Sequence, residues 1–135
     1  MKILGFEKEL STGIKLLDDQ NKLIFVLLNK LMKMYFISDL NPEYHKIYST
    51  LMVYAQKYFN NEEKLMQQIG FPQFSFHKNQ HQEFIKTIQL FNDQYLNGDN
   101  VLADFQRYIQ KWFDGHIKIS DRKLAPYLKK YEDLI

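Results

Sequence analysis

Apolar residues recur at intervals of three and four along most of the chain, which is the spacing of one face of an α-helix. Four long segments show this pattern: residues 16–36, 42–68, 73–96 and 101–117. A short fifth helical piece is expected after Asp121, with an interruption at Pro126. No segment alternates apolar and polar residues as a β-strand does, so the pattern predicts an all-α protein.

Helix-breaking and helix-starting residues separate these segments. Asn41 and Pro42 are a typical N-cap and first helical residue for the second segment, and Gly70 followed by Pro72 ends it. The stretch "NGDN" at 97–100 is typical of a turn. Four amphipathic helices joined by short loops predict an antiparallel up-down-up-down four-helix bundle, which we expect to be a single domain over residues 1–135.

Several polar residues interrupt the apolar stripes, and the predicted topology gathers them at one end. In an antiparallel bundle, the first and third helices begin where the second and fourth helices finish. The polar residues of that end are Asn21, Glu62, His77, His81, His116 and Asp121. Buried carboxylates cost several kcal/mol each unless they are paired or bound to a metal. The chain has no cysteine, so this nitrogen and oxygen set predicts a site for iron, manganese or zinc.

Composition excludes other classes of function. The formal net charge is only +2 and no long run of like charges occurs, which disfavours a nucleic-acid binder. The longest apolar run, "LIFVLL", is too short to cross a bilayer, and the first residues do not resemble a signal peptide. We therefore expect a cytoplasmic protein that binds neither nucleic acid nor a membrane.

Four motifs, taken in order, are "STGIKLLDDQNKLIF", "YFNNEEKLM", "HKNQHQEF" and "HIKISD". In this order and at these intervals they resemble the bacterial hemerythrin family, whose members are non-haem di-iron four-helix bundles. The resemblance covers nearly the whole chain. It implies that His77, His81 and His116 are the terminal ligands of the first iron, and that Glu62 and Asp121 are the bridging carboxylates.

The same resemblance implies a pocket for dioxygen next to the metal. Its expected lining is Asn21, Ile24, Phe59, Trp112, Phe113 and Ile117. The step from His116 to Asp121 turns about 140° on a regular helix. If both residues reach one site, the fourth helix must loosen or bulge near Gly115.

The chain departs from the family at the second iron. Its two terminal histidines are replaced here by Asn21 and Tyr58. Three arrangements stay open: a single metal held by the three histidines with one or both carboxylates, a dinuclear site with Tyr58 as a phenolate ligand, and a metal-free polar network. The expected cofactor is one or two non-haem iron ions per chain, with zinc as an alternative.

Two classes of function remain for such a site. A binding module would take dioxygen, nitric oxide or a related ligand for storage, delivery or sensing. An enzyme would use an open iron position for oxidase or peroxidase chemistry, with Tyr58 as a redox partner. The chain shows no nucleotide-binding glycine motif and no nucleophile–base pair, so the sequence favours the binding module.

Overall fold

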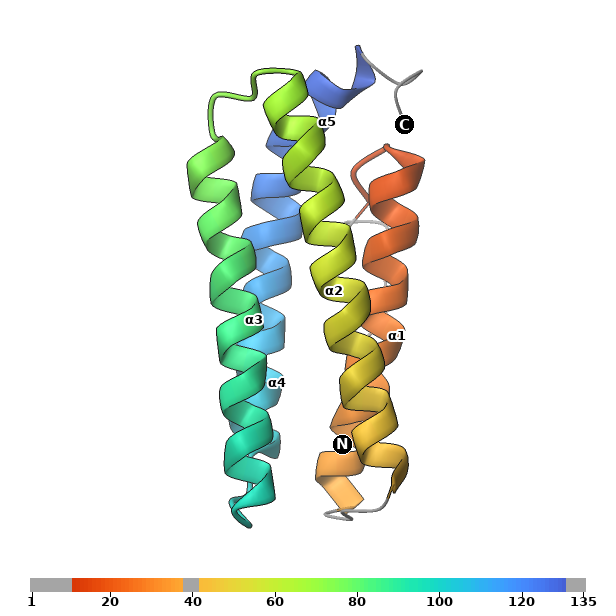
Figure 1. Ribbon diagram of the computed structural model, residues 1–135, viewed down its shortest axis with the longest axis vertical. Helices are drawn as coiled ribbons and strands as arrows, with labels where there is room; N and C mark the ends of the chain where they lie inside the picture. Colours follow the sequence, from red (N-terminus) through yellow and green to blue (C-terminus); the bar gives the residue numbers. More distant parts are fainter. Residues whose placement is uncertain (1–10, 38–41, 131–135) are drawn as a thin grey trace.

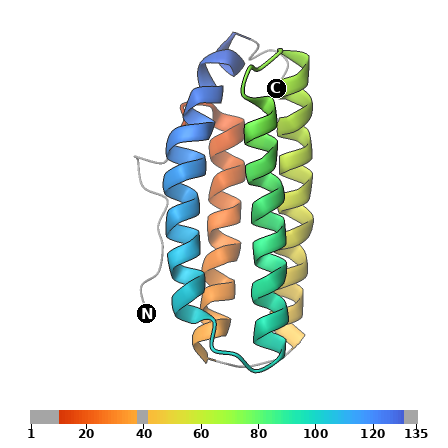
Figure 2. The ribbon, with the colours of Figure 1, turned by 90° about the vertical axis from the view of Figure 1, so that its left-hand side faces the viewer.

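The structure, a computed structural model, describes residues 11–37 and 42–130. Long antiparallel helices form an elongated bundle (Figures 1 and 2). The elements are α1 (Lys15–Ile37), α2 (Pro42–Gln68), α3 (Phe74–Leu96), α4 (Leu102–Trp112), η2 (Phe113–Asp121) and α5 (Arg122–Lys129). The predicted all-α four-helix bundle is therefore confirmed. The expected N-cap Asn41 lies outside the described residues.

The fourth helical segment of the bundle is longer than predicted. α4 does not end near Ile117 but continues through the π-helical turn η2 into α5, and Pro126 lies inside α5. The predicted interruption at Pro126 is wrong. Pro126 is exposed to solvent, whereas Leu124 and Leu128 are buried in a second apolar cluster. This packing holds the helix in place although proline removes one of its hydrogen bonds.

The interior consists of two apolar clusters with a polar layer between them. The larger cluster includes Phe59 from α2 and Phe84 from α3, and the smaller one includes Met66 from α2 and Phe71 before α3. On α2, Glu62 lies between the members of the two clusters. The buried polar residues therefore have apolar layers on both sides along the bundle axis.

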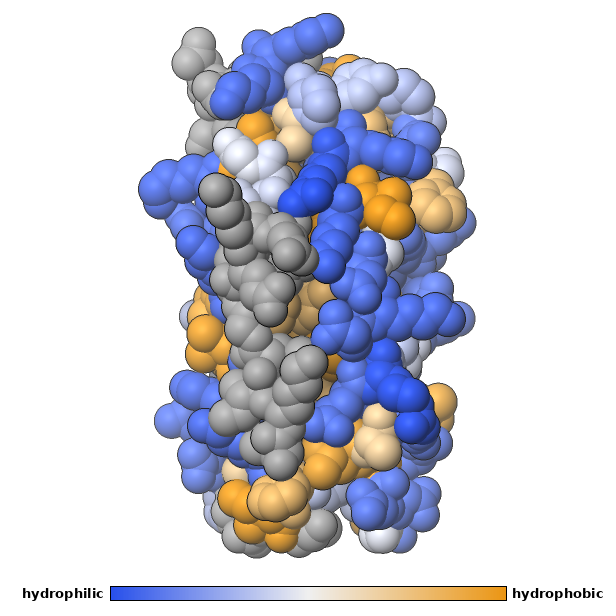
Figure 3. All heavy atoms as spheres, turned by 180° about the vertical axis from the view of Figure 1, so that it is seen from behind, coloured by the Kyte–Doolittle hydropathy of each residue, from blue (hydrophilic) through white to orange (hydrophobic). Residues whose placement is uncertain are grey.

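On the face seen in Figure 3, the described residues are mostly hydrophilic, and apolar side chains form scattered groups. None of the described helices combines the length and the apolar character that crossing a membrane requires.

Gly70 ends α2 as the sequence predicted. Its φ of 66° lies in the left-handed region that favours glycine. The N–H of Phe71 donates to the carbonyl of Met66 at 2.9 Å, and the N–H of Gly70 donates to that of Gln67 at 3.3 Å. These bonds satisfy carbonyls at the helix end and turn the chain toward α3.

We expect Gly70→Ala to lower the free energy of unfolding by about 1 kcal/mol, because alanine is strained at positive φ. Gly115 is the matched control, since it is helical and a Cβ there would meet open space. Gly115→Ala should leave the stability unchanged or raise it by up to about 1 kcal/mol. Denaturant unfolding measures both, and a Gly70→Ala variant as stable as the parent would contradict this assignment.

Candidate metal centre

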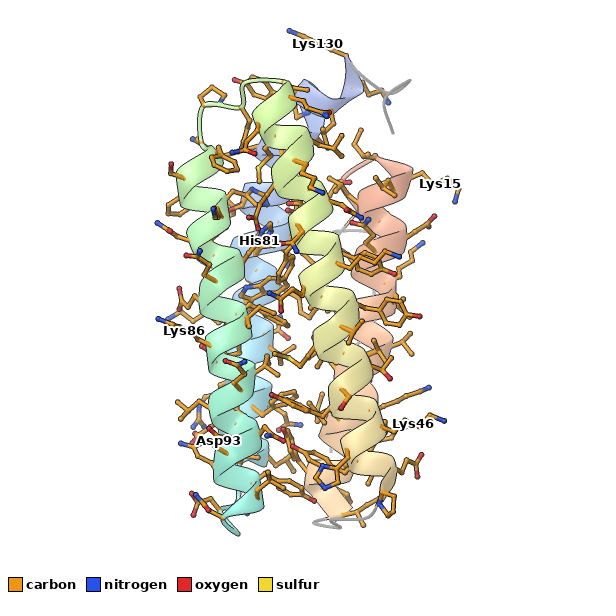
Figure 4. The ribbon with its side chains drawn as sticks, in the orientation of Figure 1. Lys15, Lys46, His81, Lys86, Asp93 and Lys130 are labelled. Atoms are coloured by element: carbon orange, nitrogen blue, oxygen red, sulfur yellow. The ribbon has the colours of Figure 1, made fainter. Side chains whose placement is uncertain are left out.

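Three elements deliver five buried polar side chains to one layer of the bundle. α2 supplies Glu62, α3 supplies His77 and His81, and η2 supplies His116 and Asp121. Each of the five is at most 5% exposed. The layer lies in the half of the bundle where α1 begins and α2 finishes, and His81 is seen there between the helices (Figure 4).

The inner atoms of these side chains converge on a small volume. The Nε2 atom of His77 contacts Glu62 Oε1 and lies 3.1 Å from Asp121 Oδ1. The Nε2 atom of His81 is 3.4 Å from Glu62 Oε1, and that of His116 is 3.2 Å from Asp121 Oδ1. One ligand atom each from Glu62 and the three histidines can be chosen so that all four lie within 4.8 Å of one another.

Most of these inner atoms are buried without a hydrogen bond of acceptable geometry. They are Glu62 Oε1, His77 Nε2, His81 Nε2 and Asp121 Oδ1. Unpaired buried polar atoms are costly, and groups of them need a cause. Nitrogen and oxygen atoms that converge in this way could hold a metal ion.

The outer nitrogens of two imidazoles are held by hydrogen bonds. His81 Nδ1 lies 2.9 Å from Glu63 Oε2, and His116 Nδ1 lies 2.9 Å from Gln80 Oε1. Because a carboxylate or amide oxygen only accepts, each Nδ1 carries the hydrogen and donates it. Each Nε2 is then left with a lone pair directed into the layer, which is the tautomer that binds a metal.

The electrostatics of the layer require a positive charge. Burial alone would lower the pKa of His77, but Asp121 and Glu62 outweigh it and raise that pKa to about 10. Burial would raise the pKa of Asp121, yet His116 and His77 lower it. Two carboxylates thus stay negative inside the bundle, and either a proton on His77 or a metal cation balances them.

The π-helical turn η2 allows one helix to supply two ligands to the layer. The i→i+5 hydrogen bonds of a π-helix put more residues into each turn than the 3.6 of an α-helix. His116 and Asp121, five residues apart, therefore come close enough for His116 Nε2 to lie 3.2 Å from Asp121 Oδ1. The turn contains Gly115, which confirms the expected bulge at that position. On a regular α-helix the two side chains would diverge by about 140°.

The comparisons with known proteins show the family of this chain. The family model "Hemerythrin HHE cation binding domain" matches residues 12–128. The chain belongs to the hemerythrin family. A bacteriohemerythrin of Stenotrophomonas maltophilia (strain R551-3) is 25% identical over 131 residues, which are 97% of this chain and 85% of that protein. One of Clostridium acetobutylicum is 28% identical over 123 residues, covering 87% of this chain and 95% of that protein. The crystal structure of wild-type hemerythrin matches with a TM-score of 0.79 at 28% identity, over 94% of this chain and 98% of that one.

Hemerythrins bind non-haem iron, and the donor set of this chain fits such an ion. Three imidazole nitrogens and two carboxylate oxygens contain no sulfur and suit iron or zinc. They are also the five side chains that the structure brings together. His45, which the sequence places outside this layer, is exposed.

Asn21 and Tyr58, the two positions predicted to depart from the family pattern, differ from the five in their surroundings. Asn21 is half-buried, and its Nδ2 donates to Asp121 Oδ2 at 3.2 Å. Tyr58 is half-buried and stacks on Tyr54, with 5.8 Å between the ring centroids. Burial and Tyr54 raise the pKa of Tyr58, which disfavours the phenolate that metal ligation needs. In the described part of the chain, Tyr58 makes no hydrogen bond to the polar layer.

Five of the six predicted pocket residues belong to the larger apolar cluster or pack against it. Ile24, Phe59, Phe113 and Ile117 are buried there. The ring of Phe59 stacks on His81 at 4.0 Å, and that of Trp112 stacks on His116 at 4.5 Å. Within residues 11–37 and 42–130, the buried indole N–H of Trp112 has no hydrogen-bond partner.

Sequence reasoning missed Glu63 and Gln80, the residues that hold the outer nitrogens. Glu63 is the second glutamate of "NNEE", beside Glu62, and Gln80 precedes His81. A search for acceptors next to each predicted ligand would find Glu63. The pairing of Gln80 with His116, which lies 36 residues away, depends on how α3 packs on η2 and has no sequence signal.

We expect iron(II), added without air, to raise the thermal unfolding temperature, because an ion that binds only the folded chain stabilises it. Free metal at 100 times the dissociation constant contributes about 2.7 kcal/mol. His77→Gln should abolish most of this shift, whereas the exposed control His45→Gln should keep it. Equal shifts in the two variants would contradict the assignment of His77 as a ligand.

Proposed function

We propose that this chain is a hemerythrin-family protein that holds one non-haem iron ion and binds dioxygen or a related diatomic ligand at it. The proposed ligands are His77, His81, His116, Glu62 and Asp121. Iron held by these residues would supply a position for a small ligand and a one-electron redox couple. The proposed domain is the whole chain, residues 1–135.

The observation that carries the single-metal proposal is the environment of Asp121. One of its oxygens, Oδ1, faces His77 and His116. The other, Oδ2, accepts a hydrogen bond from Asn21. In a bridging carboxylate this second oxygen would bind the second metal, but here an amide N–H is directed at it. On the side of Asp121 where a second metal would bind, Asn21 thus presents a hydrogen-bond donor and not a metal ligand.

The surroundings of the site favour a binding protein over an enzyme. Aromatic rings stack on His81 and His116, and the apolar residues Ile24 and Ile117 belong to the adjoining cluster. Such apolar surroundings disfavour water and polar substrates, whereas a neutral diatomic molecule can enter them. The enzymatic alternative relied on Tyr58 as a redox partner. Its hydroxyl has no hydrogen bond to the layer, so no specific contact supports that alternative.

We expect anaerobically reconstituted protein to contain about one iron per chain. The pair Asn21→His and Tyr58→His restores the imidazoles of the family's second-iron position and should raise the content toward two. The matched control is the conservative pair Asn21→Asp and Tyr58→Phe, which adds no imidazole and should not reach two. Two irons per chain in the parent protein would contradict the single-metal proposal.

We expect the ferrous protein to bind nitric oxide, with the absorption change saturating at about one molecule per iron. Ile24→Val removes one buried methyl group at a cost of about 0.5–1.5 kcal/mol in stability. It should also speed ligand binding by widening the apolar approach. Val26→Ala, at an exposed site on the same helix, is the control. If nitric oxide binds at equal rates in both variants, its path to the iron does not pass Ile24.

A further inference from the structure

Two of the three histidines in the polar layer have outer partners of different charge. The Nδ1 of His81 donates to a carboxylate, that of Glu63, at 2.9 Å. The Nδ1 of His116 donates to a neutral amide oxygen, that of Gln80, also at 2.9 Å. The two hydrogen bonds have the same length, and their acceptors differ in charge.

This difference has a chemical consequence for any ion held by the two Nε2 atoms. A carboxylate that accepts the Nδ1 hydrogen draws the proton away from the ring and increases the electron density at Nε2. The ring of His81 then donates more strongly than that of His116. A stronger and more negative donor stabilises the higher charge of a metal, because the extra attraction grows with the charge of the ion.

We infer that Glu63 is the positioning residue that shifts the iron toward its ferric state through His81, while Gln80 holds His116 without adding charge. This inference rests on the proposed iron site. It assigns to the chain a means of setting the oxidation state of that iron, and thereby the ligand that the site prefers: a ferrous ion takes dioxygen and nitric oxide, and a ferric ion favours anions.

The location of Glu63 links this effect to the surface. Its side chain is 16% exposed, whereas that of His81 is 2% exposed. Glu63 lines a groove of about 550 Å³ between α2 and α3, together with His81, Lys78 and Lys86. Solvent therefore reaches the outer side of the carboxylate while the imidazole stays buried. Glu63 thus contacts solvent in this groove and is hydrogen-bonded to His81 of the polar layer.

Glu63 and Gln80 can each be replaced by the other residue type. These replacements change the charge but keep a hydrogen-bond acceptor, so they separate an electrostatic role from a purely structural one. Glu63→Gln keeps the length of the side chain and an oxygen acceptor for His81, but removes the charge. Gln80→Glu keeps an acceptor for His116 and adds a charge. The two changes have opposite electrostatic signs at equal hydrogen-bond geometry, so their effects on the reduction potential should be opposite.

The experiment is a spectroelectrochemical titration of the iron-loaded full chain, after its iron content has been measured. Glu63→Gln should lower the ferric-to-ferrous ratio at a fixed potential by about tenfold, which corresponds to about 59 mV for one electron. Gln80→Glu should raise that ratio, and the double variant should return it toward the parent value. Glu83→Gln, an exposed glutamate on α3, is the control with the same charge change and should have little effect.

The outcomes separate the two proposals. If the parent protein binds iron but Glu63→Gln moves the potential no more than Glu83→Gln does, the inference fails and the proposed function stands. A shift of the same sign in Glu63→Gln and Gln80→Glu also overturns it, since that indicates a general disturbance. A parent protein that takes up no iron overturns both. If Glu63→Gln does not fold, the potential of Gln80→Glu decides the inference by itself.

Discussion

The interaction on which this structure depends is the burial of two carboxylates among three imidazoles in the middle of an apolar bundle. Burying a carboxylate costs several kcal/mol unless an opposite charge accompanies it. Glu62 and Asp121 lie next to imidazoles only because α2, α3 and η2 bring their side chains to the same level of the bundle. The apolar clusters above and below exclude the water that would otherwise solvate them. A positive charge, whether proton or metal, is therefore a structural requirement of the fold.

The two oxygens of Asp121 have different partners in the layer. The inner oxygen of Asp121 faces two histidines, and its outer oxygen accepts the amide hydrogen of Asn21. Outer partners hold two of the three imidazoles: Glu63 holds His81 and Gln80 holds His116. Asp121 thus contacts two of the proposed metal ligands through one oxygen and Asn21 through the other.

Much of this arrangement could be predicted from the sequence, because it follows from periodicity and topology. The helix boundaries follow from the apolar stripes and from Gly70, and the antiparallel order by itself brings His77, Glu62 and His116 to one end. The bulge at Gly115 followed from requiring two ligands five residues apart to meet. The continuation through Pro126 could not be predicted, since it depends on Leu124 and Leu128 packing against the smaller cluster. The partner of His116 and the hydrogen bond from Asn21 also depend on side-chain positions that only the packed bundle fixes.

The most direct test is the anomalous diffraction of iron-loaded crystals, measured on both sides of the iron absorption edge. We expect a single strong peak per chain, bounded by the Nε2 atoms of His77, His81 and His116, with Asn21 still bonded to the outer oxygen of Asp121. Two peaks, with the second beside Asn21 and Tyr58, would contradict the single-metal proposal. A map without a peak among the three histidines would contradict the metal centre itself.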